Sequence, residues 1–304
     1  MKKGPDYIQL YPTLRCNMSC EFCFNRSMTA VQDMSPLSFN AMIAALKGAS
    51  VKTIDIIGGE PTLHHNIIGF IHVAVQSGFS VNVSSNGTNL AALEKIMAIG
   101  KQVTVGISIN DRETLKQASE FIQRRKPVVK TVFIDDPDAD IAQTILSLKP
   151  RKFYLIYRDA AGPEDLKNTV PFYRFVSVMQ QYYDPREVGS VYCSGFLPDV
   201  ENAPELAQVR CPAGTTKLGV MPDGAAYPCN LFFCKKEFFL GNIFHDSFES
   251  IWNHHVLSFF RTAQGNACKQ LSCRLHARCH GGCPAQALQI CGDLEAPDPR
   301  CNSH

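Results

Sequence analysis

Three cysteines near the start of the chain have the residue type and the spacing of a metal site. Cys16, Cys20 and Cys23 lie in the stretch LRCNMSCEFC, residues 14–23, and no fourth cysteine follows nearby. Three thiolates can hold three irons of a [4Fe–4S] cluster and leave the fourth iron open to a further ligand. An open position is typical of a catalytic metal centre, and a zinc site with three cysteine ligands is the alternative.

Cysteine is also unusually abundant, with 13 in 304 residues. Beyond the first three, the chain has Cys193, Cys211, Cys229 and Cys234, and six more between Cys268 and Cys301. The N-terminus has no apolar segment of a secretory signal, so we expect a cytoplasmic, reducing location. Clustered cysteines in that setting favour iron–sulfur or metal ligation, with a pair of four-cysteine zinc sites as the alternative for the C-terminal group.

The remaining composition excludes several classes of partner. A formal net charge of +2 gives no electrostatic reason to expect a nucleic acid or a membrane surface. No run of 18 apolar residues exists that would predict a membrane span. The cysteines therefore remain the main indication of function.

The elements that position these residues follow an alternating pattern in the first half of the chain. Short runs rich in Val, Ile, Phe and Tyr predict strands, and amphipathic segments between them predict helices. Six such units imply an α/β fold, a partial (β/α)6 barrel with its chemistry at the C-terminal ends of the strands. The expected strands are 7–14, 53–57, 80–84, 103–109, 128–134 and 153–157; the expected helices are 36–46, 66–76, 91–99, 112–124, 141–148 and 171–183.

The second half loses this alternation and becomes rich in cysteine and turn signals. A hairpin is expected from residues 218–221 and 225–228, joined at Pro222-Asp223-Gly224. A single amphipathic helix is expected at 247–261. We therefore predict two domains, residues 1–185 and residues 186–304.

Polar or flexible residues follow several predicted strands. Gly58-Gly59-Glu60-Pro61 ends the second strand, where glycines permit close backbone approach and a glutamate can accept from an ammonium group. Ser84 and Asn86 end the third strand, and Ser108 and Asn110 the fourth. Capping of the next helices by Thr88, Asn110 or Asp111 is the alternative. Arg158 ends the sixth strand, either as a carboxylate partner or as a surface charge.

Cys16-x3-Cys20-x2-Cys23, with Gly58-Gly59-Glu60-Pro61 on the next strand, resembles the radical S-adenosylmethionine (SAM) superfamily. The resemblance implies a [4Fe–4S] cluster whose open iron binds the amino and carboxylate groups of SAM. It places Phe22 near the SAM adenine and the Gly58–Pro61 segment at the SAM amino group. It also implies SAM contacts from Ser84, Asn86, Ser108, Asn110 and Arg158.

The C-terminal cysteines resemble the SPASM extension, which binds two auxiliary [4Fe–4S] clusters. Cys211-x12-Gly224-x4-Cys229 is followed by Cys268-x4-Cys273-x5-Cys279-x3-Cys283 and then Cys301, although the first gap of the quartet usually has two residues. The resemblance implies one set of ligands for a proximal cluster, with Cys193 or Cys234 as candidate fourth ligand, and another set for a distal cluster. The proximal set is Cys211, Cys229 and Cys283; the distal set is Cys268, Cys273, Cys279 and Cys301.

The two resemblances together imply reductive cleavage of SAM to a 5′-deoxyadenosyl radical, hydrogen abstraction from a substrate, and oxidation aided by the auxiliary clusters. A peptide or protein substrate, crosslinked or oxidised on a side chain, and a flavodoxin or ferredoxin-type reductant are implied. Asn230 follows Cys229 where sulfatase-maturing relatives have an acidic residue, which favours another maturation reaction. Because the first strand is expected by residue 7, we expect a leader peptide to bind elsewhere or through a separate protein.

Two alternatives come from other classes of protein. One is a SAM-dependent dehydrogenase or epimerase of a small molecule, which would need a closed pocket instead of a wide cleft. The other is a non-catalytic iron–sulfur electron carrier, which would not require Gly58-Gly59-Glu60-Pro61 beside the first cysteines.

Overall fold

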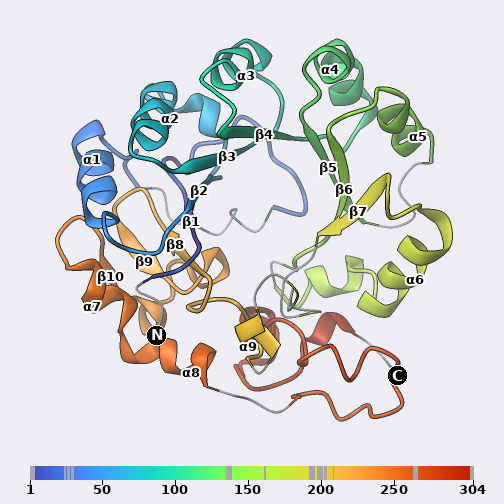
Figure 1. Ribbon diagram of the computed structural model, residues 1–304. Coiled ribbons are helices and arrows are strands. Elements are labelled where there is room, and N and C mark those ends of the chain that lie inside the picture. Colours follow the sequence, from blue (N-terminus) through green and yellow to red (C-terminus); the bar gives the residue numbers. More distant parts are fainter. Residues whose placement is uncertain are drawn as a thin grey trace. The chain divides into compact units, whose positions relative to one another are not determined.

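The computed structural model describes residues 4–23, 25, 28, 31–134, 139–160, 162–191, 196, 201, 204–207, 209–262 and 266–301. Strands, mostly parallel, alternate with helices, which confirms the predicted α/β class (Figure 1). Two compact units are formed: unit 1 is Met1–Ser19, Asn25–Gly106 and Ala213–Arg261, and unit 2 is Cys20–Phe24, Ile107–Pro212 and Thr262–His304. Each unit combines separate chain segments, and the domain division at residues 185 and 186 stays a prediction.

Unit 1 contains a sheet whose order is β10-β9-β8-β1-β2-β3. β1 (Tyr7–Leu10), β2 (Thr53–Ile56) and β3 (Ser80–Ser85) are parallel neighbours, as expected from their apolar runs. β8 (Lys217–Val220) and β9 (Ala225–Tyr227) form the predicted hairpin, and β10 (Gly241–Asn242) pairs with β9. β8 also pairs in parallel with β1, a contact that the sequence did not predict. All four residues of β8 are buried, as a central strand requires.

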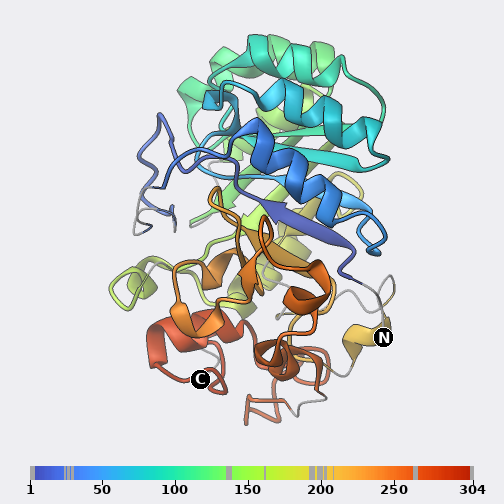
Figure 2. The same ribbon diagram turned by 90° about the vertical axis from the view of Figure 1, so that its left-hand side faces the viewer.

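Three helices cover one face of the β1–β3 sheet: α1 (Pro36–Ala45), α2 (Ile67–Gln76) and α3 (Leu90–Met97) (Figures 1 and 2). The Ser35 side chain caps α1 by accepting from the Ser38 amide, and Pro36 occupies the first turn. Phe39 of α1 stacks on Phe70 of α2 with ring centroids 4.2 Å apart. The apolar faces of these helices therefore complete the core of unit 1.

The single helix predicted at 247–261 is wrong. The segment forms α7 (Phe248–Trp252), the 3-10 turn η7 (His255–Leu257) and α8 (Ser258–Arg261). His254 is extended, with ψ 136°, and its Nδ1 accepts from the Val256 amide at 3.3 Å. This local side-chain cap starts a new turn and interrupts the helix, an outcome that apolar spacing does not reveal.

Unit 2 contains the parallel neighbours β5 (Val128–Phe133), β6 (Lys152–Tyr157) and β7 (Val188–Val191). Its helices are α4 (Arg112–Arg125), α5 (Ala139–Ser147), α6 (Phe172–Tyr182) and α9 (Pro284–Cys291), and β4 (Val103–Ser108) contains the boundary between the units. β7 and α9 were not predicted. Pro284 at the start of α9 and Gly292 just past its end, with φ 73°, were usable signals for that helix.

No helix among the described residues is both long enough and apolar enough to cross a membrane.

Candidate functional site

In unit 1, the Gly58-Gly59-Glu60-Pro61 segment packs against the chain that leads to Cys16. The Gly59 amide donates to the Thr13 carbonyl at 3.0 Å, and the Glu60 amide donates to the Arg15 carbonyl at 2.7 Å. Gly58 has φ 119°, a conformation that side-chain-bearing residues avoid. A Cβ on Gly59 would lie 2.1 Å from the Arg15 carbonyl oxygen, so glycine is required by close backbone approach.

Gly59→Ala should therefore lower the free energy of unfolding by about 1–3 kcal/mol or more, because backbone of the Arg15 segment must move. Gly69→Ala is the matched control: Gly69 lies within α2, and a Cβ there would meet nothing within 4 Å. The control should stabilise the protein by about 0.5–1 kcal/mol. Denaturant unfolding of both variants measures the difference, and equal stabilities would contradict the account of Gly59.

Glu60 is a fully buried carboxylate whose oxygens are hydrogen-bonded on both sides. Oε1 accepts from the Thr62 amide at 3.0 Å, the Thr62 hydroxyl at 2.6 Å and the Ser85 hydroxyl at 2.9 Å. Oε2 accepts from the Asn86 amide at 2.7 Å. Glu60 thus joins the end of β2 to the end of β3. Ser85, which no motif singled out, is the serine that contacts Glu60, and the SAM contact expected of Ser84 stays a prediction.

Glu60→Gln should lower the free energy of unfolding by about 1–3 kcal/mol. An amide replaces one accepting oxygen with a donor, so an N–H group would face either the Asn86 amide or the donors from Thr62 and Ser85. Thr62→Val is the control, since it removes one donor and keeps the carboxylate. Urea unfolding compares the two, and a smaller loss in Glu60→Gln than in Thr62→Val would rule out this role.

Asn86 connects Glu60 to the first cysteine of the predicted cluster. Its Nδ2 donates to Asn17 Oδ1 at 2.9 Å and lies 3.9 Å from Cys16 Sγ. Its Oδ1 accepts from the Thr88 amide at 3.0 Å and the Thr88 hydroxyl at 2.7 Å. Thr88 therefore braces Asn86, and the cap of α3 is supplied by Asn89, which accepts from the Ala92 amide.

A further contact, which no motif indicated, fixes the strand end before Cys16. Asp33 accepts from the Thr13 hydroxyl at 2.6 Å and from Arg15 Nη2 at 2.5 Å. The hydrogen bond to Arg15, together with that to Thr13, outweighs burial and holds the pKa of Asp33 below its usual value. Arg15 also donates to the Leu63 carbonyl at 2.7 Å. These bonds tie the segment before Cys16 to the turn after Glu60.

Unit 2 carries the other two cysteines of the first motif. The Cys23 amide donates to the Cys20 carbonyl at 3.1 Å, which forms a turn with Phe22 inside it. Cys20, Phe22 and Cys23 are all partly exposed. Cys16 belongs to unit 1, so the assignment of the three cysteines to one cluster stays a prediction, as does the contact of Phe22 with an adenine.

The remaining predicted SAM contacts in unit 2 differ in their surroundings. Ser108 is half-buried at the end of β4. Asn110 Oδ1 accepts from the Val132 amide at 2.9 Å, while Asp111 is the residue that caps α4. Arg158 is 5% exposed and pairs with Asp165, so the alternative of a surface charge is wrong. Its Nε has no hydrogen-bond partner within the described residues.

The four predicted ligands of the distal cluster lie together in unit 2. One cavity is lined by Cys268, Cys273, Cys279 and Cys301, with apolar walls that include Phe172 and Phe196. Backbone amides of Gln270 and Leu275 each lie 3.4 Å from the Sγ of Cys268 and of Cys273 respectively. Soft sulfur donors with N–H groups directed at them suit an iron–sulfur cluster. The longer gap between Cys268 and Cys273 does not remove either residue from the cavity.

Burial alters the acid–base behaviour of this group. Desolvation raises the pKa of the Cys279 thiol to about 11, although the Gly281 and Gly282 amides oppose the shift. The metal-free site therefore holds Cys279 as a thiol near neutral pH, and metal binding must release its proton.

The predicted proximal ligands are divided between the units. Cys211 and Cys283 are buried in unit 2, and Cys229 is buried in unit 1. Of the two candidate fourth ligands, Cys234 is exposed in unit 1 with φ 63°, and Cys193 lies outside the described residues. The composition of this cluster stays a prediction.

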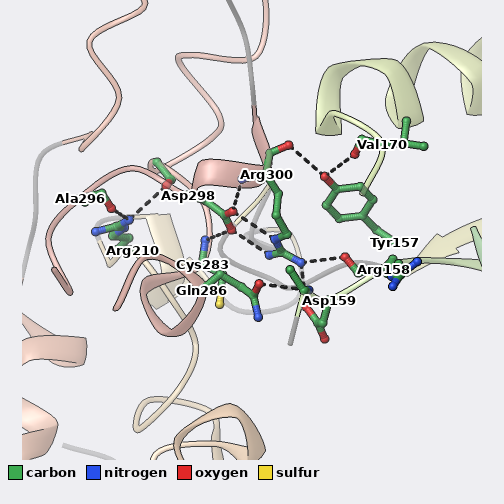
Figure 3. A network of polar contacts seen from close by, with 12 residues as sticks. Tyr157, Arg158, Asp159, Val170, Arg210, Cys283, Gln286, Ala296, Asp298 and Arg300 are labelled. Atoms are coloured by element: carbon green, nitrogen blue, oxygen red, sulfur yellow. Dashed lines mark hydrogen bonds and ion pairs between the residues drawn. The ribbon is translucent and has the colours of Figure 1, made fainter. Parts of the chain in front are cut away.

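A buried ion-pair network that the sequence analysis missed joins the loops of Cys283 and Cys301 (Figure 3). Asp298 Oδ2 accepts from the Cys283 amide at 2.9 Å and from Arg300 Nη2 at 2.7 Å. The Asp298 carbonyl accepts from the Cys301 amide at 3.1 Å. One residue thus fixes the backbone of a predicted ligand of each auxiliary cluster.

Arg300 is completely buried at the centre of this network. Besides Asp298, it donates to Asp159 Oδ1 at 2.8 Å and to the Arg158 carbonyl at 3.0 Å. Burial disfavours its charge, but Asp298 and Asp159 outweigh burial and raise the pKa of Arg300. Its guanidinium also lies 5.2 Å from the ring centre of Tyr157, whose hydroxyl donates to the Arg300 carbonyl.

Segments in both halves of the chain match known protein families. Residues 10–132 match the radical SAM superfamily, and residues 211–284 match SPASM, an iron–sulfur cluster-binding domain. The two matches confirm the resemblances on which the predictions rest. They cover the first cysteine motif, the Glu60 segment and the predicted SPASM ligands except Cys301 and the candidate Cys193.

Two curated relatives match most of the chain. The antilisterial bacteriocin subtilosin biosynthesis protein AlbA of Bacillus subtilis is 26% identical over 302 residues, covering 91% of this chain and 66% of AlbA. The mycofactocin maturase MftC of Mycolicibacterium smegmatis is 26% identical over 322 residues, covering 95% of this chain and 80% of MftC. The chain thus spans just under two thirds of the length of AlbA.

Among solved structures, SuiB of Streptococcus suis bound to its precursor peptide SuiA matches 99% of this chain and 76% of SuiB. The TM-score is 0.74 and the sequence identity 16%. This likeness confirms the fold.

Proposed function

Because this chain belongs to the radical SAM superfamily and carries a C-terminal SPASM domain, we propose that it oxidises a peptide or protein substrate by radical chemistry. The cofactors would be SAM and three [4Fe–4S] clusters, one at the first cysteine motif and two in the SPASM region. When bound, the first cluster would cleave SAM to methionine and a 5′-deoxyadenosyl radical that abstracts hydrogen from substrate, while the auxiliary clusters take up an electron.

The observation that carries the SAM site is the set of contacts from Glu60 through Asn86 to Cys16. A buried carboxylate fixes the end of β3, and the Asn86 side chain extends from there to the sulfur of a predicted cluster ligand. Because Cys16 and the Glu60 segment are held in one unit, a ligand bound by the first can contact the second. This arrangement supports the Gly58-Gly59-Glu60-Pro61 segment, which the buried Glu60 side chain anchors, as the part of the chain at the SAM amino group.

Arg158 is the candidate for the SAM carboxylate. It is buried and paired with Asp165, and its Nε–H has no partner within the described residues. A guanidinium held by one carboxylate and keeping a donor can bind a second carboxylate. The role of Arg158 depends on this unused donor.

The cavity around Cys268, Cys273, Cys279 and Cys301 supports the distal cluster. Four thiolates close every iron of a cluster, which suits electron transfer, whereas an open iron suits catalysis. The SPASM region would therefore supply the acceptor for the one electron that the substrate radical gives up as it is oxidised. We expect a flavodoxin or ferredoxin-type protein to supply the electron for the first cluster.

The relatives support a peptide as substrate. AlbA acts in bacteriocin biosynthesis, MftC is a maturase, and SuiB has been solved with a precursor peptide. Asn230 follows Cys229 where sulfatase-maturing relatives carry an acidic residue, so a crosslink or another side-chain oxidation is favoured.

The test is incubation of the reconstituted protein with SAM, dithionite and a short peptide encoded beside its gene. Oxidation removes two hydrogen atoms: one leaves with 5′-deoxyadenosine, and the other as a proton and an electron. Mass spectrometry should show a peptide lighter by two hydrogens, formed with 5′-deoxyadenosine. An unchanged peptide, together with oxidation of a small-molecule alcohol under the same conditions, would overturn the peptide proposal.

A further inference from the structure

Arg210 is a buried arginine directly before Cys211, and its guanidinium joins two loops of unit 2 (Figure 3). The residue is 2% exposed. Nη1 donates to the Leu294 carbonyl at 3.0 Å, and Nη2 donates to the carbonyls of Gly281, at 3.1 Å, and Ala296. Gly281 lies between Cys279 and Cys283, so the side chain reaches the loop that carries predicted ligands of both auxiliary clusters.

The charge of Arg210 lacks the compensation that Arg300 has. Arg300 pairs with two carboxylates, whereas the hydrogen bonds described for Arg210 all go to neutral carbonyls. A buried cation is costly unless an anion offsets it. Burial accordingly lowers the pKa of Arg210, and the groups that oppose this include Cys283, Asp298, Cys211 and Cys279. Three of these four groups are predicted cluster ligands, and the fourth, Asp298, already pairs with Arg300.

A donor of the same guanidinium is also unused. Arg210 Nε is buried and has no hydrogen-bond partner within the described part of the chain. A buried donor without a partner carries a desolvation cost, which a ligand with acceptor atoms would relieve. Iron–sulfur clusters supply acceptor sulfur atoms and negative charge together.

We propose that Arg210 is a positioning residue for the auxiliary cluster held by Cys211 and Cys283, and that its charge raises the reduction potential of that cluster. The proposal rests on the proposed auxiliary clusters. A fixed positive charge in a low-dielectric interior favours the state with one more electron, and hydrogen bonds to cluster sulfur act in the same direction. Arg210 would thus make the cluster a better acceptor of the substrate electron.

The experiment measures potential and iron, independently of turnover. In a full-length Cys16→Ala, Cys20→Ala, Cys23→Ala background, only auxiliary clusters contribute iron and electron paramagnetic resonance signals. Arg210→Gln removes the charge and Arg210→Lys keeps it. Arg261→Gln is the control, because Arg261 is a half-buried arginine that also has an N–H group without a partner among the described residues, but only burial shifts its pKa.

We expect Arg210→Gln to retain iron and to lower the auxiliary midpoint potential by about 59 mV, a tenfold change in the ratio of reduced to oxidised cluster. The iron content and the auxiliary midpoint potential of Arg210→Lys and of Arg261→Gln should equal those of the background protein. An unshifted potential in iron-loaded Arg210→Gln would overturn the proposal, and so would an equal shift in Arg210→Lys or Arg261→Gln.

Loss of auxiliary iron in Arg210→Gln leaves Arg210→Lys as the deciding variant. Iron content and potential equal to the background would support charge compensation. Loss of iron or a lowered potential in Arg210→Lys would overturn charge compensation. The hydrogen bonds of the guanidinium to the backbone carbonyls would then explain the effect of Arg210. A background protein that binds no iron would contradict the auxiliary clusters themselves, an outcome distinct from any failure specific to Arg210.

Discussion

The Cys20→Ala variant will form no 5′-deoxyadenosine from SAM and dithionite, whereas the unmodified protein will. The substitution removes one of only three protein ligands of the proposed SAM cluster, so its iron should be lost. Iron per chain should fall from about 12 to about eight, since each of three clusters holds four. Liquid chromatography of the nucleoside and colorimetric iron analysis measure the two effects.

Cys291→Ala provides the matched control for this variant. Cys291 is an exposed cysteine at the end of α9 and has no role in the proposed clusters. The Cys291→Ala variant should keep about 12 irons per chain and should cleave SAM at the normal rate. Cleavage by Cys20→Ala at the rate of Cys291→Ala would refute the assignment of Cys20.

The second large effect is expected from Cys279→Ala. This residue is buried in the cavity shared with the other predicted distal ligands, so its loss leaves the cluster one thiolate short. The variant should lose about four irons per chain and peptide oxidation. It should retain cleavage of SAM, because the cluster at Cys16, Cys20 and Cys23 does not depend on Cys279 for a ligand.

Cys273→Ala keeps this prediction testable where Cys279→Ala folds poorly, because Cys273 lines the same cavity but is partly exposed. Both variants should show the same split between retained SAM cleavage and lost peptide oxidation. Full peptide oxidation by either one would remove that cysteine from the distal cluster.

The alternation of strands and helices could be predicted because each element carries its own apolar pattern. The strands at β2, β3 and β6 and the helices α1 and α4 lie close to the expected ranges. The Glu60 segment could also be identified, since its glycines and glutamate form a local motif at a strand end. These features depend on residues that are close together in the sequence, so a local sequence pattern is enough to predict them.

Features that depend on distant neighbours could not be predicted. The parallel pairing of β8 with β1 joins residues more than half the chain apart, and four residues of β8 carry no signal for their partner. Ser85 rather than Ser84 contacts Glu60 because the pleat turns that side chain inward. Asp298 and Arg300 belong to no motif, although a buried ion pair beside Cys301 organises the region.

The central claim is that the cluster at Cys16, Cys20 and Cys23 has an open iron that binds and cleaves SAM. The most direct measurement is formation of 5′-deoxyadenosine by the anaerobically reconstituted protein with SAM and dithionite, in the absence of substrate. We predict slow but continuing formation of the nucleoside, accompanied by methionine in equal amount. A fully iron-loaded protein that forms neither product would contradict the claim.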